Sequence, residues 1–175
     1  PGKPLLKING LSIISHVSKK AEEANIGDVI VATEDQEIVD EVKKNKGNVI
    51  LTSKDPQTGT DRIWEAFQKL KLKNVEYIIN LQGDEPLIDI EDIKNLDLLT
   101  KKNNCHLSTL ACHMVEKNYE KNENVVKVET EDKLSKHKVS LAKKFYRYSD
   151  NLKKNIYHHI GIYEFSVSTL EIFTS

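Results

Sequence analysis

Residues 78–89, IINLQGDEPLID, join a hydrophobic strand to an acidic exit. An apolar run of strand length ends at Gly83, and Asp84 and Glu85 follow directly before a proline. Glycine allows the backbone to turn sharply at such a point. The two carboxylates could cap the following helix, or one of them could hold a divalent cation such as Mg²⁺. The residues alone support these two interpretations equally.

The segments around this stretch alternate between apolar runs of strand length and helical periodicity. We expect strands at 28–33, 48–51 and 75–81 and helices over 11–25, 35–47, 60–71 and 89–102. Thr60 and Asp89 could cap the last two helices. Strands separated by helices of this length predict βαβ units and a mostly parallel central sheet.

The second half of the chain has a different pattern. Strand-like segments at 105–114, 124–130 and 156–165 are separated by less helical sequence, which predicts an antiparallel excursion of the sheet. Residues 131–155 are mostly polar and predict no element. The 175 residues suffice for one α/β domain with a sizeable core, so we expect a single domain over 1–175.

The composition restricts the class of protein. With 38% hydrophobic and 30% charged residues, the chain is typical of soluble globular proteins. No apolar run approaches the roughly 20 residues that span a bilayer, so we expect no membrane insertion. No signal peptide is recognisable, which makes a cytoplasmic location the expectation. The net charge of −1 predicts no basic surface, so we expect no nucleic-acid partner.

The two cysteines, Cys105 and Cys112, each precede a histidine and could suggest a zinc site. Seven residues of strand separate them by roughly 23 Å, so one strand cannot gather both pairs around a metal. We expect two reduced cysteines of a cytosolic protein instead.

Three polar segments follow the expected strands, where open parallel sheets bind ligands. They are ATEDQE (32–37), SKDPQTGTDR (53–62) and QGDEP (82–86). In the second segment, backbone amides at a helix start could bind a phosphate or a base edge with the help of Thr58 and Thr60. Plain helix capping is the more common role of such a start. The chain has neither a P-loop nor a GxGxxG fingerprint.

The strand-like segment YHHIGIY (157–163) has two contrasting faces. Alternation places on one face His159, Gly161 and Tyr163, and on the other His158, Ile160 and Ile162. The first face is polar and aromatic, and its glycine leaves room for a ligand, which suits a sugar. The alternative to a ligand site is a half-exposed strand whose histidine forms hydrogen bonds within the protein.

Six segments, taken in order, resemble one family closely. They are PGKPLLKING (1–10), VIVATEDQEIVDEV (29–42), QTGTDRIWEA (57–66), INLQGDEPLI (79–88), NENVVKV (122–128) and HHIGIYEF (158–165). In these segments the chain is similar to the 3-deoxy-manno-octulosonate (Kdo) cytidylyltransferases, also called CMP-Kdo synthetases. The order and spacing of the segments make the resemblance specific, and it covers nearly the whole chain outside 131–155.

The resemblance implies a Rossmann-like nucleotide-diphospho-sugar transferase fold and a nucleotidyltransferase activity. In this reaction the anomeric hydroxyl of Kdo attacks the α-phosphate of CTP, giving CMP-Kdo and diphosphate for lipopolysaccharide assembly. Positioning and electrostatics supply most of the catalysis in such chemistry. The resemblance also implies CTP and Kdo as substrates, Mg²⁺ as cofactor, and a homodimer formed through the second half of the chain.

The resemblance assigns one set of residues to CTP. Lys3 of PGKP would contact the phosphates of CTP. The residues expected to line the cytidine site, with an arginine nearby, are Thr58, Gly59, Thr60 and Arg62.

A second set is assigned to the metal and the sugar. Asp84 would be the Mg²⁺ ligand, while Glu85 would be structural. Gln82 would lie between nucleotide and sugar, and His159 and Tyr163 would contact Kdo. The resemblance thus predicts a catalytic set of Lys3, Gln82 and Asp84.

The chain also departs from the family's pattern. The family has an opening strand and a glycine- or serine-containing loop that ends in an arginine, and we expect this segment upstream of Pro1. The acidic position for a second metal carboxylate and a Glu-Gln pair beside the sugar would follow Ser175. Glu34 stands where the family usually has Asp, and Arg147 in KKFYRYS receives no assigned role.

Two alternative functions remain, one within the same enzyme class and one of a different class. A cytidylyltransferase that activates a sialic acid would share the fold and a similar acidic sugar. A non-catalytic nucleotide-binding or dimerisation domain is the second alternative, because residues 1–175 by themselves lack half of the family's phosphate-binding groups.

Overall fold

The computed structural model of the protein describes residues 2–114, 122–148 and 154–175. The helical elements of these residues are η1 (Lys3–Leu5), α1 (Ile13–Ala24), α2 (Gln36–Lys44), α3 (Gly59–Leu70), α4 (Ile90–Lys102) and α5 (Val167–Phe173). The strands are β1 (Lys7–Ile8), β2 (Leu11–Ser12), β3 (Val31–Thr33), β4 (Val49–Leu51), β5 (Tyr77–Asn80), β6 (Leu107–Cys112), β7 (Lys127–Thr130), β8 (Ala142–Tyr146) and β9 (Ile156–Ser166). No helix among these residues is long and apolar enough to cross a membrane.

Helices α2, α3, α4 and α5 begin at side chains that accept hydrogen bonds from the first turn. Asp89 caps α4 as expected, since its side chain accepts a hydrogen bond from the Glu91 amide at 2.9 Å. The expected cap of α3 at Thr60 is wrong, because Thr58 is the capping residue. The Thr58 hydroxyl accepts from the Asp61 amide, and the Asp61 carboxylate accepts from the Thr58 amide. This reciprocal pair satisfies two amides at once, which a cap at Thr60 would not do.

The strands of the first half do not form the mostly parallel sheet that the βαβ pattern predicts. Within the described residues, β3 and β4 make the only parallel pair, and they form a sheet of their own. The next strand in the chain, β5, pairs antiparallel with β9. Strand pairing depends on segments distant in sequence, and here β9 returns from the far end of the chain to lie against β5. The central strand that the resemblance places before Pro1 stays a prediction.

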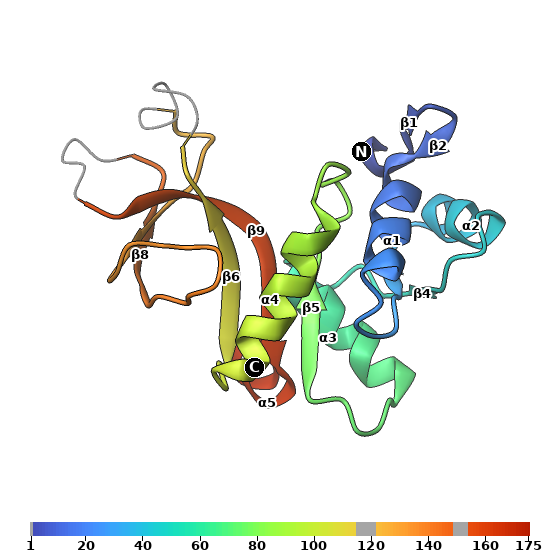
Figure 1. Cartoon of the computed structure of the whole chain (residues 1–175). Coiled ribbons are helices and arrows are strands. Elements are labelled where there is room, and N and C mark those ends of the chain that lie inside the picture. Colours follow the sequence, from blue (N-terminus) through green and yellow to red (C-terminus); the bar gives the residue numbers. More distant parts are fainter. Residues whose placement is uncertain (1, 115–121, 149–153) are drawn as a thin grey trace.

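The antiparallel second half agrees with the prediction. β9 is the centre of the five-stranded sheet: it pairs antiparallel with β5, β6 and β7, and β7 pairs antiparallel with β8. Figure 1 shows β9 as a long, strongly curved ribbon beside β6, with β8 at the outer end of the sheet. β8 lies within 131–155, where the sequence predicted no element. Residues 149–153 of that segment lie outside the described residues.

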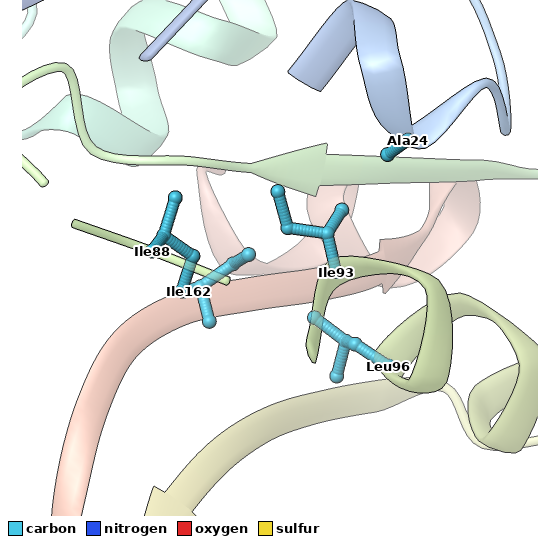
Figure 2. Packing of buried hydrophobic residues seen from close by; sticks show 5 residues of the cluster. All are labelled: Ala24, Ile88, Ile93, Leu96 and Ile162. Atoms are coloured by element: carbon cyan, nitrogen blue, oxygen red, sulfur yellow. The ribbon is translucent and has the colours of Figure 1, made fainter. Parts of the chain in front are cut away.

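Helix α4 packs on one face of this sheet and closes the main apolar cluster. The cluster consists of Ala24 from α1, Ile88, Ile93 and Leu96 from α4 and its approach, and Ile162 from β9 (Figure 2). Ile93 and Ile162 are each only 2% exposed. Burial of an isoleucine or leucine side chain contributes about 1.5–3 kcal/mol, so the cluster fixes α4 against β9. Consequently α4 covers one face of β5 and β9, and the other face of these strands points away from α4.

The pairing of β9 with β6 is interrupted by a bulge. Thr109 pairs with Tyr163 and the next residue, Leu110, pairs with Ile160, which leaves Gly161 and Ile162 outside the register. Four residues of regular strand span about 13 Å. The rings of His159 and Tyr163 nevertheless lie only 5.4 Å apart between their centroids. The bulge therefore bends β9 so that two aromatic side chains of the same face come into contact.

Candidate functional site

A row of polar side chains crosses three neighbouring strands on the face opposite α4. Asn80 on β5 is paired with Tyr163 on β9, and Tyr163 is paired with Thr109 on β6. Ile79 and Ile162, which precede Asn80 and Tyr163, pack in or against the apolar cluster under α4. Because successive side chains of a strand point to opposite faces, the row lies on the other side. It connects the segment expected to bind CTP with the segment expected to bind Kdo.

Asn80 gathers the residues at the nucleotide end of the row. It is 2% exposed, and its Nδ2 donates a hydrogen bond to Thr60 Oγ1 at 3.2 Å. Its Oδ1 accepts a hydrogen bond from Gln82 Nε2 at 3.0 Å. Gly59 is close as well, because a Cβ at that position would lie 3.5 Å from Gln82 Nε2. The structure therefore brings Gly59, Thr60 and Gln82 close together, while their contacts with the substrates stay a prediction.

Asn80 was not predicted as a site residue. The signal was present in the sequence, because a single amide ends the otherwise apolar strand YIIN. A buried amide at such a position needs hydrogen-bond partners, and the partners here are both residues of the expected site.

Thr58 and Arg62 are engaged with other protein groups. The Thr58 hydroxyl donates to Asp61 Oδ2 at 2.7 Å and accepts from the Asp61 amide. The Arg62 guanidinium donates to Thr52 Oγ1 at 2.6 Å and forms an ion pair with Glu34 at 2.6 Å. Arg62 thus ties α3 to the ends of β3 and β4 and shapes the surroundings of the site. A direct contact of either residue with CTP stays a prediction.

Lys3 and Asp84 form an ion pair at the exit of β5. Gly2 adopts a φ of +82°, which glycine tolerates best, and starts the short helical turn that presents Lys3. Lys3 Nζ donates to Asp84 Oδ2 at 2.7 Å, and this hydrogen bond raises the pKa of Lys3. Gly83 fixes the turn from the inside, since a Cβ there would lie 2.8 Å from Ile14 Cδ1. The acidic exit is therefore held between α1 and the N-terminal turn.

His159 and Tyr163 lie at the other end of the row, and both are sheltered from solvent. His159 is 8% exposed, and burial lowers its pKa, with a further contribution from the charge of His158. Burial raises the pKa of Tyr163. The neutral phenol and the neutral imidazole are the forms that hydrogen-bond a polyhydroxy ligand.

Phe145 and Thr109 complete the surroundings of His159 and were not predicted as site residues. The Phe145 ring meets the His159 ring edge to face at 5.0 Å between centroids. Thr109 Oγ1 lies 2.9 Å from His159 Nε2. No sequence signal indicated Phe145, because it lies on β8 in the polar segment without a predicted element.

Asp84 is the candidate for holding a cation. Among residues 2–114, 122–148 and 154–175, no group of three or more His, Cys, Asp or Glu side chains gathers as a metal site. Asp84 is partly exposed, with 43% of its side chain accessible, and it already holds the ammonium of Lys3. Mg²⁺ commonly takes one or two carboxylates and completes its shell with phosphates and water, so a single carboxylate at a rigid exit fits this ion.

Comparison with known proteins identifies the family of the chain. A family model described as Cytidylyltransferase matches residues 1–175. The 3-deoxy-manno-octulosonate cytidylyltransferase of Wigglesworthia glossinidia brevipalpis is 32% identical over 179 residues, which cover 99% of this chain and 73% of that protein. The protein of the same name from Rhodopseudomonas palustris (strain BisB18) is 38% identical over 180 residues, with 100% of this chain and 71% of that protein covered.

The structural comparison leads to the same class. A structure of CMP:2-keto-3-deoxy-manno-octonic acid synthetase complexed with CTP matches with a TM-score of 0.85 at 30% identity, covering 99% of this chain and 71% of that one. The α/β fold and the matches to these relatives define a nucleotidyltransferase. The chain belongs to the cytidylyltransferase family.

Proposed function

We propose that this protein transfers the cytidylyl group of CTP to 3-deoxy-manno-octulosonate, giving CMP-Kdo and diphosphate. The proposal is carried by similarity to Kdo cytidylyltransferases over nearly the full chain. The continuous row from Thr60 through Asn80 and Tyr163 to His159 supports it, because the two substrates must meet for the transfer.

CTP would bind at the end of the row formed by α3 and the exit of β5. Gly59 and Thr60 are the first residues of α3. At this end of the helix, the backbone amides and the helix dipole favour a negative or electron-rich group. Lys3 would approach the phosphates from the N-terminal turn. Gln82, which is hydrogen-bonded to Asn80, would lie between the nucleotide and the sugar.

Mg²⁺ would be held by Asp84 together with phosphate oxygens of CTP. When bound, it neutralises the charge that develops on the phosphates during the transfer. The carboxylate contributes a fixed position, because Gly83 packs on Ile14 and the exit of β5 has little freedom. Lys3 contributes a second positive charge within reach of the same phosphates.

Kdo would bind against His159 and Tyr163. Tyr163 can donate a hydrogen bond through its protonated phenol, and neutral His159 offers one donor and one acceptor nitrogen. The attacking anomeric hydroxyl would then be oriented toward the α-phosphate of CTP. The bond between the α-phosphate and the diphosphate would break as the new phosphate–oxygen bond forms, and the hydroxyl proton would be released to solvent with the diphosphate.

The decisive experiment measures diphosphate release and CMP-Kdo formation with CTP, Kdo and Mg²⁺. We expect product only when all three are present, and a much smaller rate when N-acetylneuraminate replaces Kdo. A faster reaction with N-acetylneuraminate would favour the sialic acid alternative. Binding of CTP without diphosphate release for either sugar would contradict the proposal and favour a non-catalytic nucleotide-binding domain.

We also infer a homodimer formed through the second half of the chain and a cytoplasmic location, where CTP is available. The outer strand β8 supports the dimer, because it carries the exposed side chain of Phe145 and follows the exposed Leu141. Unpaired outer strands with apolar side chains are common association surfaces. Sedimentation equilibrium should give twice the mass of the chain, and cell fractionation should place the activity in the soluble fraction.

A further inference from the structure

We propose that Thr109 is a positioning residue that holds His159 as the Nε2–H tautomer, so that Nδ1 is presented as a hydrogen-bond acceptor. The ligand that we infer for Nδ1 is a hydroxyl group of the acceptor sugar and not its carboxylate. This second part rests on the proposed function, whereas the tautomer follows from the protein alone.

The tautomer follows from the partners of one hydroxyl group. Thr109 Oγ1 lies 2.6 Å from the carbonyl oxygen of Ile162 and 3.2 Å from that of Ile160. Carbonyl oxygens only accept hydrogen bonds, and a threonine hydroxyl has a single proton to donate. That proton is directed to Ile162 O, which is the shorter contact. The contact of 2.9 Å between Thr109 Oγ1 and His159 Nε2 therefore requires the ring nitrogen to donate.

The bulge explains why the Ile162 carbonyl group needs the hydroxyl. Ile160 and Ile162 flank Gly161 at the point where the β6–β9 register shifts. Carbonyl groups at a bulge lose their regular strand partners, and buried ones require another donor. Thr109 occupies the position directly before the shift on β6 and supplies that donor. The hydroxyl proton is thus committed to the backbone of β9.

The ring of His159 is held from further directions as well. The backbone amide of His159 donates to Val126 O at 2.9 Å, which anchors the residue next to β7. Phe145 meets the ring edge to face, and Tyr163 lies against it at 5.4 Å between centroids. With Nε2 bound to Thr109, the remaining ring nitrogen is Nδ1, which carries the lone pair of the neutral ring.

The chemistry of a lone pair decides which sugar group it can bind. An unprotonated ring nitrogen accepts a hydrogen bond from a hydroxyl group, whereas it repels a carboxylate, which has acceptors only. A sugar acid bound here would therefore place a hydroxyl on His159 and its carboxylate elsewhere. Burial and the neighbouring His158 favour the neutral ring, which keeps this acceptor available near neutral pH.

The first arm of the test observes the tautomer directly in the free protein. In ¹⁵N-labelled wild-type protein at neutral pH, the ring nitrogens of His159 should show a protonated Nε2 and an unprotonated Nδ1. Thr109→Val keeps the shape of the side chain and removes the hydroxyl, so it should abolish the pure tautomer. Thr109→Ser should restore it. A wild-type ring with its proton on Nδ1, or an unchanged tautomer in Thr109→Val, would overturn the proposal.

The second arm measures steady-state kinetics. Loss of one oriented hydrogen bond costs about 1–1.4 kcal/mol, so Thr109→Val should raise the KM for Kdo about five- to tenfold while the KM for CTP stays unchanged. Thr109→Ser should return the KM for Kdo close to wild type. Ser108→Ala, on the opposite face of the same strand, is the matched control and should leave both constants unchanged.

The two arms separate the tautomer from the proposed function. If the tautomer changes as expected but the KM for Kdo does not, the assignment of the sugar hydroxyl to Nδ1 is wrong. If wild-type protein shows no turnover of CTP and Kdo, the proposed function fails, and the NMR experiment still decides the role of Thr109.

Discussion

Lys3 Nζ lies 2.7 Å from Asp84 Oδ2, although the two residues are 81 positions apart in the chain. The ion pair joins the N-terminal turn to the exit of β5. It also places a positive charge at the carboxylate that we assign to Mg²⁺. A metal ion held by Asp84 would compete with this ammonium for the carboxylate, and Lys3 would supply positive charge beside the phosphates of CTP.

Asp84→Asn should lower turnover by a large factor, on the order of a hundredfold or more, because it removes a ligand of the ion that stabilises the developing charge. The fold should stay intact, since the ion pair with Lys3 is exposed and such pairs contribute little to stability. Diphosphate release and thermal unfolding, measured on the same preparation, test both statements. Near-normal turnover in this variant would contradict the assignment of Asp84 as a metal ligand.

Lys3→Met should raise the KM for CTP and, in the absence of CTP, increase the affinity of the protein for Mg²⁺. The second effect is expected because methionine keeps the length of the side chain but no longer competes for Asp84. Calorimetric titration of Mg²⁺ into the CTP-free protein measures it directly. Lys7→Met, on the exposed strand β1, is the control for loss of a positive charge. Equal Mg²⁺ affinity in the Lys3 variant and wild type would show that the ammonium does not compete with the metal.

Asn80→Ala should lower stability and weaken CTP binding together. The variant leaves Thr60 and Gln82 without their shared partner in a site where Asn80 itself is buried, and such a loss costs about 1–3 kcal/mol. Chemical denaturation gives the free energy of unfolding, and steady-state kinetics give the KM for CTP. Asn95→Ala on α4, on the other face of the sheet, is the matched control. A variant with normal stability and normal KM would show that the amide does not organise the nucleotide end of the row.

Local signals in the sequence were sufficient for helices α1 to α4 and for the faces of β9, whereas α5 was not predicted. Helical periodicity and the cap at Asp89 predicted α4, and strict alternation predicted that His159 and Tyr163 share a face. Strand pairing was not predictable in the same way, because the partner of β5 is more than seventy residues away and runs antiparallel. The bulge opposite Thr109 depends on two strands at once, so neither strand alone indicates it.

For the site residues too, local sequence motifs were predictive, whereas features that depend on tertiary contacts were not. Gly59, Thr60 and Gln82 were predicted from the order of motifs, and the structure brings them together through Asn80, whose role depends on tertiary contacts. Phe145 was not predictable, because the polar sequence of 131–155 has no periodicity from which β8 could be inferred.

Glu164 gives the protein a pH-dependent stability that is independent of the site. Its side chain lies on the α4 side of β9, is fully buried, and faces Thr100 and Asp97 of α4. Burial raises its pKa to about 7, and the negative charge of Asp97 adds to this effect. The folded protein therefore keeps the proton of Glu164 at pH values where the unfolded chain, with an ordinary pKa near 4.5, has lost it.

The sign of the effect follows from this difference in bound protons. As the pH rises from about 4.5 to about 7, the folded state binds more protons than the unfolded state, so the free energy of unfolding falls by about 3 kcal/mol in total. Glu164→Gln replaces the protonated carboxyl by a neutral amide of the same shape, so the variant should lack this fall and be more stable than wild type at pH 8. Urea unfolding of both proteins between pH 4.5 and pH 8 measures the difference, with Glu171→Gln on the exposed face of α5 as control. Parallel pH profiles for Glu164→Gln and wild type would mean that the buried carboxyl titrates near its ordinary pKa and that water reaches it.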